Sequence, residues 1–347
     1  MSVLVTESLD LETIEPGRTT RVLLSLTSDA LGQAIQIPVL VARGKRPGPV
    51  VGITAAVHGN ELNGIPVIHH LFAALEGKPL RGTVVGVVVA NVPGLHAHQR
   101  EFVDGTDLNH IFPGSQHGNV SQVYAHRLLH QLVARFDFLL DLHTASFGRI
   151  NSLYVRADMS HPKTARMAIL QKPQIILHNR ASDGTLRGAA MEQGIPAITI
   201  EIADPHRFQP KYVRPTLVGV LSVLAELGLV RRRPPRPGPP PLLCERSYWM
   251  YTDRGGLLEV LPQLADRVEA GEVVARVRDA FGDLRTEYRA PESGVVIGKS
   301  TNPVGQTGAR ILHLGLESEP NSELRRSEPP PLANPPPEPE PETEPSE

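Results

Sequence analysis

His58 and Glu61 stand three residues apart in the segment His58-Gly59-Asn60-Glu61, directly after an apolar run over residues 49–57. Residues at positions i and i+3 lie on one side of a helical turn, so the imidazole and the carboxylate can reach the same ion. Zinc is bound by such nitrogen and oxygen ligands, and a catalytic zinc site has three protein ligands and one open position. The pair therefore predicts part of a zinc site.

His143 is the candidate for the third ligand. It follows the apolar residues 138–140 in Asp141-Leu142-His143-Thr144, at the predicted end of a buried strand. A lone histidine there is more often structural, but the presence of His58 and Glu61 favours a metal ligand. Asp107 and Asp141 are candidates to accept the other N–H of the ligating imidazoles, as carboxylates commonly do. A turn or capping role is the alternative for each aspartate.

Glu201 lies inside the apolar segment 197–202, which has the pattern of a strand. A charge in a strand is costly unless it is paired, so an edge position facing water is one interpretation. The other is a general base that takes a proton from the attacking water. Partial burial raises the pKa of a carboxyl group toward neutrality, which suits that task.

A polar, glycine-containing segment over residues 99–114 connects a predicted strand to a predicted helix, and loops in such positions often carry function. Arg100 could stabilise a developing oxyanion, and Asn109 could hydrogen-bond a substrate carboxylate. Arg187 is predicted to open a short helix that leads into the strand of Glu201. A surface salt bridge is the alternative for each arginine.

Apolar runs alternate with helical patterns through the first two thirds of the chain, which predicts an α/β fold with helices on both faces of a mixed sheet. In such sheets ligands bind beyond the carboxyl ends of the strands. His58, Asn91 and His143 each follow a predicted strand, and Glu201 lies near the end of another, so these side chains are expected to converge. The predicted strands are 49–57, 83–90, 138–142, 175–177 and 197–202, and the predicted helices are 62–75, 120–135 and 215–228.

Composition divides the chain into four parts: a catalytic domain over 1–229, a linker rich in proline and arginine over 230–243, an all-β module over 244–316 and a disordered Pro/Glu-rich tail over 317–347. Short alternating strands broken by Gly, Pro and Asp predict a small barrel or sandwich in the module. Its sequence resembles lipoyl- and biotinyl-carrier half-barrels. The modified lysine of those carriers is missing at the expected turn, which argues against a carrier role.

The overall composition argues against several classes of protein. A formal net charge of −2 and a pI near 6.7 give no electrostatic case for binding nucleic acid or an anionic membrane. The sequence has no apolar stretch long enough for a spanning helix, and its start does not have the pattern of a signal peptide. The single cysteine, Cys244, is expected to be a buried apolar residue and fits a cytoplasmic location. An oligomer remains possible.

Together these segments resemble the succinylglutamate desuccinylase/aspartoacylase family, which has a zinc carboxypeptidase-like fold. The resemblance rests on His58-Gly59-Asn60-Glu61, Asp107-Leu108-Asn109, Asp141-Leu142-His143 and Glu201, and covers roughly residues 45–316. It implies a three-layer α/β/α catalytic domain and hydrolysis of the amide bond of an N-acylated amino acid.

The resemblance also implies one zinc ion per chain, held by His58, Glu61 and His143, with Glu201 activating water. Arg100 would hold the carbonyl oxygen, and Asn109 and Arg187 would bind the substrate.

One position departs from the family, because His110 stands where its members usually carry arginine after Asp-Leu-Asn. Histidine is shorter than arginine and mostly neutral at pH 7. His110 is therefore a candidate substrate-binding residue, together with Asn109 and Arg187, and the change argues against a succinyl- or aspartyl-type dianion as substrate. The alternatives are a less anionic amide or ester, a role for another basic residue such as Arg100, Arg149 or Arg187, or weakened activity.

The sequence thus predicts a zinc-dependent hydrolase that cleaves the amide bond of a small N-acyl amino acid. A carboxypeptidase-like peptidase or an esterase would use the same core. A non-catalytic metal-binding or interaction protein is a further alternative, but it has no physical need for a free carboxylate beside an open metal site.

Overall fold

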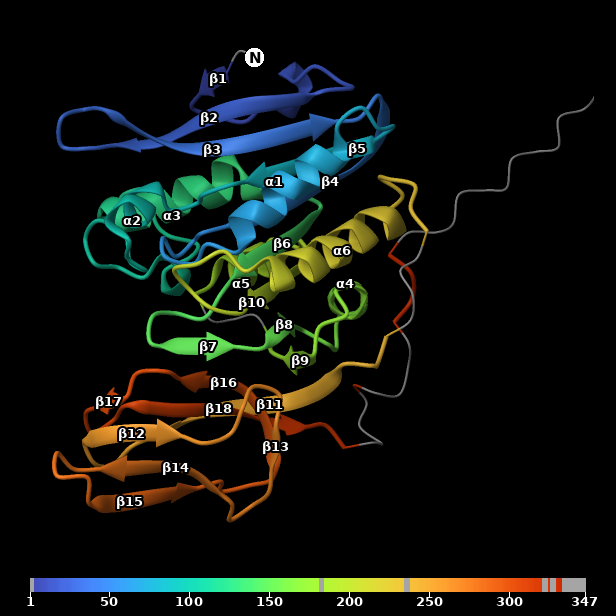
Figure 1. Cartoon of the computed structure of the whole chain (residues 1–347). Coiled ribbons are helices and arrows are strands. Elements are labelled where there is room, and N and C mark those ends of the chain that lie inside the picture. The colour runs from blue at the N-terminus through green and yellow to red at the C-terminus, as the bar shows by residue number, and fades with distance from the viewer. Residues whose placement is uncertain (1–2, 181–183, 234–237, 320–323, 325–328, 333–347) are drawn as a thin grey trace, which may run out of the picture.

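The computed structural model describes residues 3–180, 184–233, 238–319, 324 and 329–332. Figure 1 shows antiparallel N-terminal strands at one end, helices packed around the central strands, and a group of strands alone at the other end. No helix among the described residues is long and apolar enough to cross a membrane.

A mixed sheet runs through the whole molecule, in the order β1-β2-β3-β5-β4-β6-β10-β8-β9-β11-β18-β16-β13, and β7 pairs with β16 beside this path. Its first eight strands are β1 (Val3–Thr6), β2 (Thr19–Ser28), β3 (Ala34–Arg43), β4 (Arg46–Ala55), β5 (Arg81–Val87), β6 (Phe138–His143), β7 (Arg149–Asn151) and β8 (Leu153–Ala157). The other six are β9 (Ile175–His178), β10 (Ala197–Ile202), β11 (Leu242–Tyr251), β13 (Arg267–Val268), β16 (Gly294–Ser300) and β18 (Arg310–Glu317).

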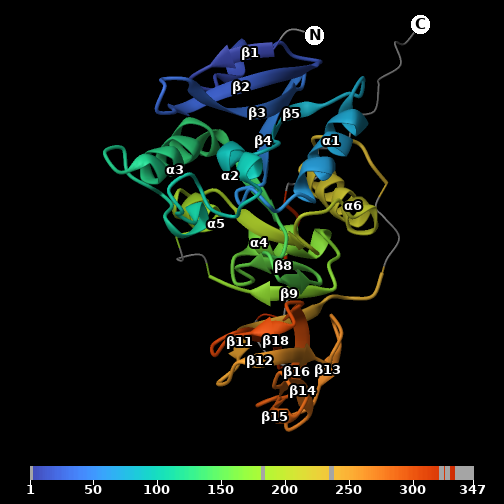
Figure 2. The ribbon, with the colours of Figure 1, turned by 60° about the vertical axis from the view of Figure 1, so that its left-hand side comes forward.

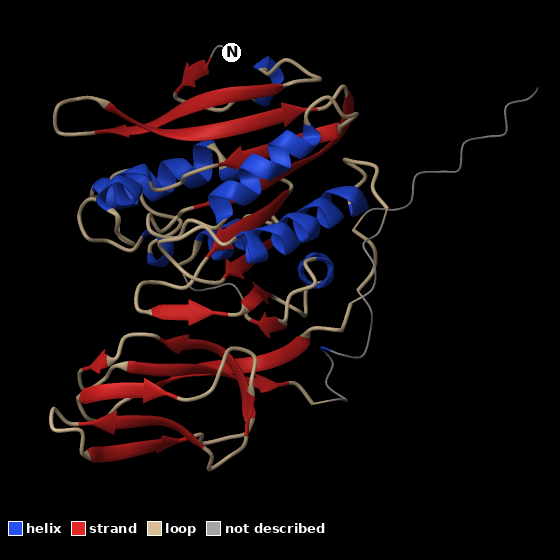
Figure 3. Cartoon of the chain, viewed as in Figure 1, coloured by secondary structure: helices blue, strands red, loops and turns tan. Residues whose placement is uncertain are grey.

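Helices cover both faces of the central strands, as the sequence predicts (Figures 2 and 3). One buried cluster contains apolar side chains of α1 (Gly64–Leu75), α4 (Pro162–Leu170) and α6 (Pro210–Glu226). A second cluster, on the other face, contains those of α3 (Val120–Gln131) and α5 (Leu186–Glu192). The strands contribute alternate residues to the two clusters: Leu140 and Leu142 of β6 face the first, and Leu139 faces the second. This alternation decides which face receives each polar side chain.

The predicted strands of the central sheet are all present, and β10 has the predicted bounds. The predicted start of the last helix is wrong, because α6 begins at Pro210 and continues through Pro215. Proline suits the first helical turn because its missing N–H needs no partner there. The strands β2 and β3, which form a long N-terminal hairpin, were not predicted.

Residues 242–317 contain strands and no helix. β12 (Gly256–Val260), β14 (Val273–Arg278), β15 (Leu284–Arg289) and β17 (Val304–Gly305) form a second, antiparallel sheet. β11 begins within the predicted linker and pairs in parallel with β9, so this β region continues the central sheet. Cys244 is buried in β11, as predicted.

The predicted disordered tail lies mostly outside the described residues. Two of its described residues, Leu324 and Leu332, pack against the first buried cluster.

His313 of β18 provides a test of the packing between the β region and the central strands. It is buried, stacks on Trp249 with ring centroids 5.1 Å apart, and contacts Tyr154 of β8 edge-on. Burial, followed by the neighbouring cations Arg156, Arg310 and Arg149, lowers the pKa of His313 to about 3. The imidazole is therefore neutral in the folded protein at pH values where the unfolded chain binds a proton.

The stabilising contribution of neutral His313 is present above pH 6.5 and is lost as the pH falls from 6.5 toward 3. Between pH 6.5 and pH 5, it should decrease the free energy of unfolding by up to about 2 kcal/mol. Urea unfolding of wild type and His313→Gln at several pH values measures this difference. An identical pH dependence in the two proteins would contradict the buried neutral state.

Candidate functional site

His58 and Glu61 lie in a tight turn between β4 and α1. The turn begins at Ala56, which has a φ of 52°, and the Glu61 amide donates to the His58 carbonyl oxygen at 3.1 Å. The pair therefore shares one turn as predicted, although the helix begins only at Gly64. Gly59 allows the turn to approach α2 (Val92–Ala97), since a Cβ at this position would lie 2.0 Å from the carbonyl carbon of Gly94.

Replacing Gly59 by alanine should displace the turn that carries His58 and Glu61, because the obstructing atoms belong to backbone. We expect destabilisation of about 1–3 kcal/mol, typical of overpacking, together with weaker metal binding. Urea unfolding and zinc titration measure the two effects. Gly238→Ala is the control, since nothing lies within 4 Å of a Cβ there; equal behaviour of the two variants would refute the steric argument.

His143 and Glu201 end up side by side because their strands are neighbours. β6 and β10 pair in parallel, and the register places Glu201 opposite His143 and Thr199 opposite Asp141. Paired residues of neighbouring strands project to the same face of a sheet. Glu201 therefore projects on the face of His143, at the carboxyl ends of both strands.

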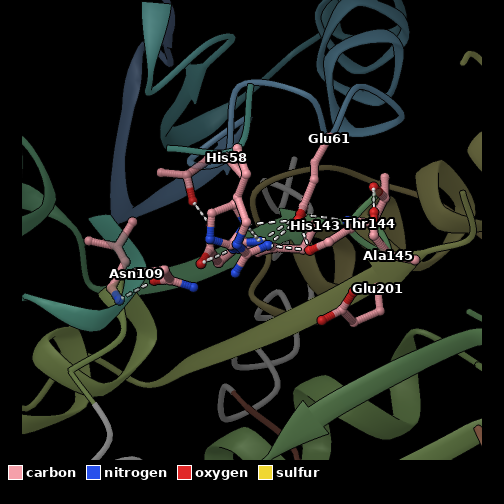
Figure 4. Close-up of polar contacts among 12 residues, drawn as sticks. His58, Glu61, Asn109, His143, Thr144, Ala145 and Glu201 are labelled. Atoms are coloured by element: carbon pink, nitrogen blue, oxygen red, sulfur yellow. Dashed lines mark hydrogen bonds and ion pairs between the residues drawn. The ribbon is translucent and has the colours of Figure 1, made fainter. Parts of the chain in front are cut away.

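His58, Glu61 and His143 converge on one point (Figure 4). The three side chains offer ligand atoms that all lie within 4.8 Å of one another. The Glu61 oxygens lie 2.9 Å from His58 Nδ1 and 3.0 Å from His143 Nδ1. All three residues are at most 3 % exposed. The convergence predicted from the sequence is thus present in the structure.

Two aspartates orient the imidazoles, as predicted. His58 Nε2 lies 3.0 Å from Asp107 Oδ1, and His143 Nε2 lies 2.8 Å from Asp141 Oδ2. Asp141 is itself held by the Thr54 hydroxyl, which donates to Oδ1 at 2.6 Å. Each carboxylate engages the outer nitrogen of an imidazole, which directs Nδ1 toward the shared point.

The donor set fits a cation. With the Nε2 protons of both imidazoles donated to aspartates, the Nδ1 lone pairs of His58 and His143 face each other at 3.2 Å. Two lone pairs at this distance repel unless a positive charge lies between them. Burial opposes ionisation of Glu61, but positive charge at His58 and His143 outweighs it and holds the pKa of Glu61 well below the usual value. Burial likewise opposes protonation of His143, but Asp141 and Glu61 raise its pKa well above the usual value, so a positive charge, carried by a proton or a metal ion, is favoured between these groups. Two neutral imidazoles and one carboxylate are a usual ligand set for zinc.

Arg100 lies beside the cluster. Its Nε donates to Asp107 at 2.8 Å and its Nη1 donates to Glu61 Oε1 at 2.8 Å, while Nη1 also contacts the Ser146 hydroxyl. Its other terminal nitrogen, Nη2, has no hydrogen-bond partner among the described residues. The guanidinium is therefore fixed on two sides and keeps one nitrogen with donor capacity for a ligand.

Glu201 is held apart from the three clustered ligands. Asn151 of β7 donates to its Oε2 at 3.1 Å, and Arg156 of β8 lies 3.7 Å from its Oε1. Burial raises the pKa of Glu201, although Arg156 opposes this shift. A carboxyl group with a raised proton affinity next to a predicted metal site has the properties expected of a general base.

The predicted substrate-binding residues contact other parts of the protein. Asn109 Oδ1 accepts from the Leu186 amide at 2.8 Å and so joins the loop to α5. His110 has a 69 % exposed side chain whose Nε2 lies 3.5 Å from Asp107. Arg187 is buried and donates to the Asn179 carbonyl oxygen at 3.1 Å. The contacts named here do not involve His58, Glu61 or His143, and the roles of these residues in substrate binding remain predictions.

Four further residues contribute to the site and were not predicted. Thr54 hydrogen-bonds Asp141, and Thr144 hydrogen-bonds Glu61. Ser146 contacts Arg100, and Asn151 hydrogen-bonds Glu201. The Thr144 amide donates to Glu61 Oε2 at 2.9 Å. Proximity in sequence to His143 could have indicated Thr144 and Ser146. Asn151 had no such signal, because its position depends on the pairing of β7 with β16.

The buried His-Glu-His cluster that could hold a metal ion lies in a mixed α/β sheet, and sequence comparison assigns the chain to a family. The family model described as the succinylglutamate desuccinylase/aspartoacylase catalytic domain matches residues 47–227. The chain belongs to this family.

A curated protein and several solved structures are similar to this chain. The chain is 29% identical over 278 residues to an N-alpha-acetyl-L-2,4-diaminobutyric acid deacetylase of Halomonas elongata, covering 76% of this chain and 80% of the relative.

The fold matches the product-bound ectoine utilization protein EutE (DoeB) of Ruegeria pomeroyi with a TM-score of 0.79 at 22% identity, over 88% of this chain and 98% of that one. A succinylglutamate desuccinylase/aspartoacylase of Rhodobacter sphaeroides gives the same values.

Proposed function

We propose that this protein is a zinc-dependent hydrolase that cleaves the amide bond of a small N-acyl amino acid. The observation that carries the proposal is the convergence of His58, Glu61 and His143, with Glu201 opposite His143 on the neighbouring strand. Membership in the desuccinylase/aspartoacylase family and the similarity to a curated deacetylase support the same reaction class.

His58, Glu61 and His143 would hold the zinc ion. When bound, zinc would supply a positive charge that polarises the amide carbonyl and acidifies a water molecule. Asp107 and Asp141 keep the two imidazoles in the tautomer that directs Nδ1 at the ion.

Glu201 would act as the general base. Its carboxylate takes a proton from the water as the oxygen attacks the carbonyl carbon, and later gives that proton to the nitrogen of the leaving amine. The Nη2 nitrogen of Arg100 would donate a hydrogen bond to the oxygen on which negative charge develops. The C–N bond breaks, a C–O bond forms, and the products are a carboxylate and an amine.

A panel of substrates tests this function. The zinc-loaded protein would be assayed with N-acetyl-L-2,4-diaminobutyrate, N-succinylglutamate, N-acetylaspartate, short peptides and acyl esters. We expect turnover of N-acyl amino acids, with a preference for a small neutral acyl group because His110 replaces the family's arginine. Turnover confined to peptides would assign a carboxypeptidase-like activity, and turnover confined to esters would assign an esterase. Absence of turnover on the whole panel would contradict the proposal.

A further inference from the structure

Arg149 is directed toward the site by the strand that carries it. β7 contains both Arg149 and Asn151, and residues two apart in a strand project on the same face. Asn151 on that face donates to Glu201. Consistently, burial, followed by Arg310 and Arg100, lowers the pKa of Arg149, while the carboxylates Glu61 and Glu201 oppose this shift. Arg149 therefore lies between the candidate general base and the C-terminal β region.

Trp249 of β11, in the C-terminal β region, contacts Arg149 through a cation–π interaction. The Arg149 guanidinium lies 5.7 Å from the centroid of the Trp249 ring, and the guanidinium of Arg310 lies 5.4 Å from the same centroid. Arg310 comes from β18, which pairs with β11 and places Tyr251 opposite Arg310. Two cations from distant parts of the sequence thus share one indole ring.

Neither of these two guanidiniums forms an ion pair with a described carboxylate. Neither side chain has a hydrogen bond or ion pair with any residue that the structure describes. Arg149 is half-buried and Arg310 is exposed. Other cations lie nearby as well, since Arg100 lowers the pKa of Arg149, and Arg156, Arg310 and Arg149 lower the pKa of buried His313, whereas Glu61 and Glu201 act on Arg149 without an ion pair to it. Like charges held close together without a carboxylate favour an anionic ligand.

We propose that Arg149 and Arg310, held on Trp249, bind the free carboxylate of the amino-acid part of the substrate. This inference rests on the proposed function and names the chemistry that the site selects. A guanidinium offers a planar pair of N–H donors that matches a carboxylate. Arg149 reaches the site through β7, while Arg310 and Trp249 reach it from the β region, so both parts of the chain build the specificity site.

The proposal also accounts for His110. His110 is exposed near Asp107 and, unlike an arginine, carries no permanent positive charge. Arg149 and Arg310 supply permanent positive charge elsewhere at the site. The chain can therefore recognise one carboxylate while the acyl group remains uncharged.

Trp249 is the only tryptophan in the chain and reports directly on this site. Full-length, zinc-loaded protein carrying Glu201→Gln would be titrated with N-acetyl-L-2,4-diaminobutyrate and with N-acetylglycine, while tryptophan emission is recorded. The primary carboxamide of each compound is the matched neutral ligand. Glu201→Gln prevents consumption of the ligand, so binding is measured without turnover.

We expect saturable emission changes, with the acids binding roughly 10- to 100-fold more tightly than their carboxamides, as for the loss of a charged hydrogen bond. Arg149→Met and Arg310→Met should each reduce this preference to within a few-fold. Arg285→Met removes an exposed arginine paired with Asp279, so it should leave the preference unchanged.

Three outcomes would overturn the inference: equal binding of acids and carboxamides, no emission response to either acid, or an unchanged preference in both arginine variants. If the arginines only fasten the β region to the central strands, Arg149→Met will lower the melting temperature and keep the preference. Failure of the proposed function is distinguishable, because carboxylate binding can persist in a protein that hydrolyses none of the panel compounds.

Discussion

His58→Ala should remove the bound zinc from the purified protein. The substitution leaves two ligands and removes one of the partners of Asp107. Loss of even an outer partner of a zinc ligand typically costs about 10- to 100-fold in affinity, so loss of a ligand should exceed ~100-fold. Elemental analysis after dialysis measures the zinc content, and the expected change is from about one ion per chain to almost none.

The control is His96→Ala, which removes an exposed imidazole from α2. This variant should keep its zinc. Circular dichroism of both variants checks that the fold is retained. A folded His58→Ala protein with the zinc content of wild type would show that His58 is not a ligand.

Glu201→Gln should keep zinc and lose most turnover. The amide preserves the size of the side chain but cannot accept the proton of the attacking water. Removal of a general acid–base typically costs at least ~100-fold in rate. Steady-state kinetics with a substrate identified from the panel measures kcat and KM, and the loss should fall on kcat.

Glu192→Gln is a suitable control, because Glu192 is exposed at the end of α5. It should have wild-type kinetics. Near-normal turnover by Glu201→Gln, with its zinc content confirmed, would assign proton transfer to another group and leave the three ligands untouched.

Much of the site could be predicted because its residues follow strands with strong apolar patterns. Residues 138–142 and 197–202 could be identified as buried strands. The first is followed by the polar residue His143, and the second contains Glu201 near its end. The parallel register of β6 and β10 then brings these two residues opposite each other. The apolar runs therefore indicated where these strands lie, whereas the face on which Glu201 projects follows from the register.

The remainder depended on contacts between distant segments. The alternation of buried Val22, Leu24 and Leu26 is present in the sequence, but the hairpin of β2 and β3 was not recognised. Asn151 and Arg149 belong to a strand of three residues that forms only against β16. Such a short segment has no periodicity of its own, so its role could be found only in the folded chain.

The pairing of β9 with β11 has a consequence for dissecting this protein. Leu242, Leu243 and Cys244 occupy hydrogen-bonding positions along β9. In a chain truncated before Leu242, β9 would still pair with β8 but would expose its other edge, and the unpaired amides and carbonyls of an edge strand can pair with another chain. Removal of the residues from Leu242 onward would thus produce a fragment that is prone to aggregation through the exposed edge of β9.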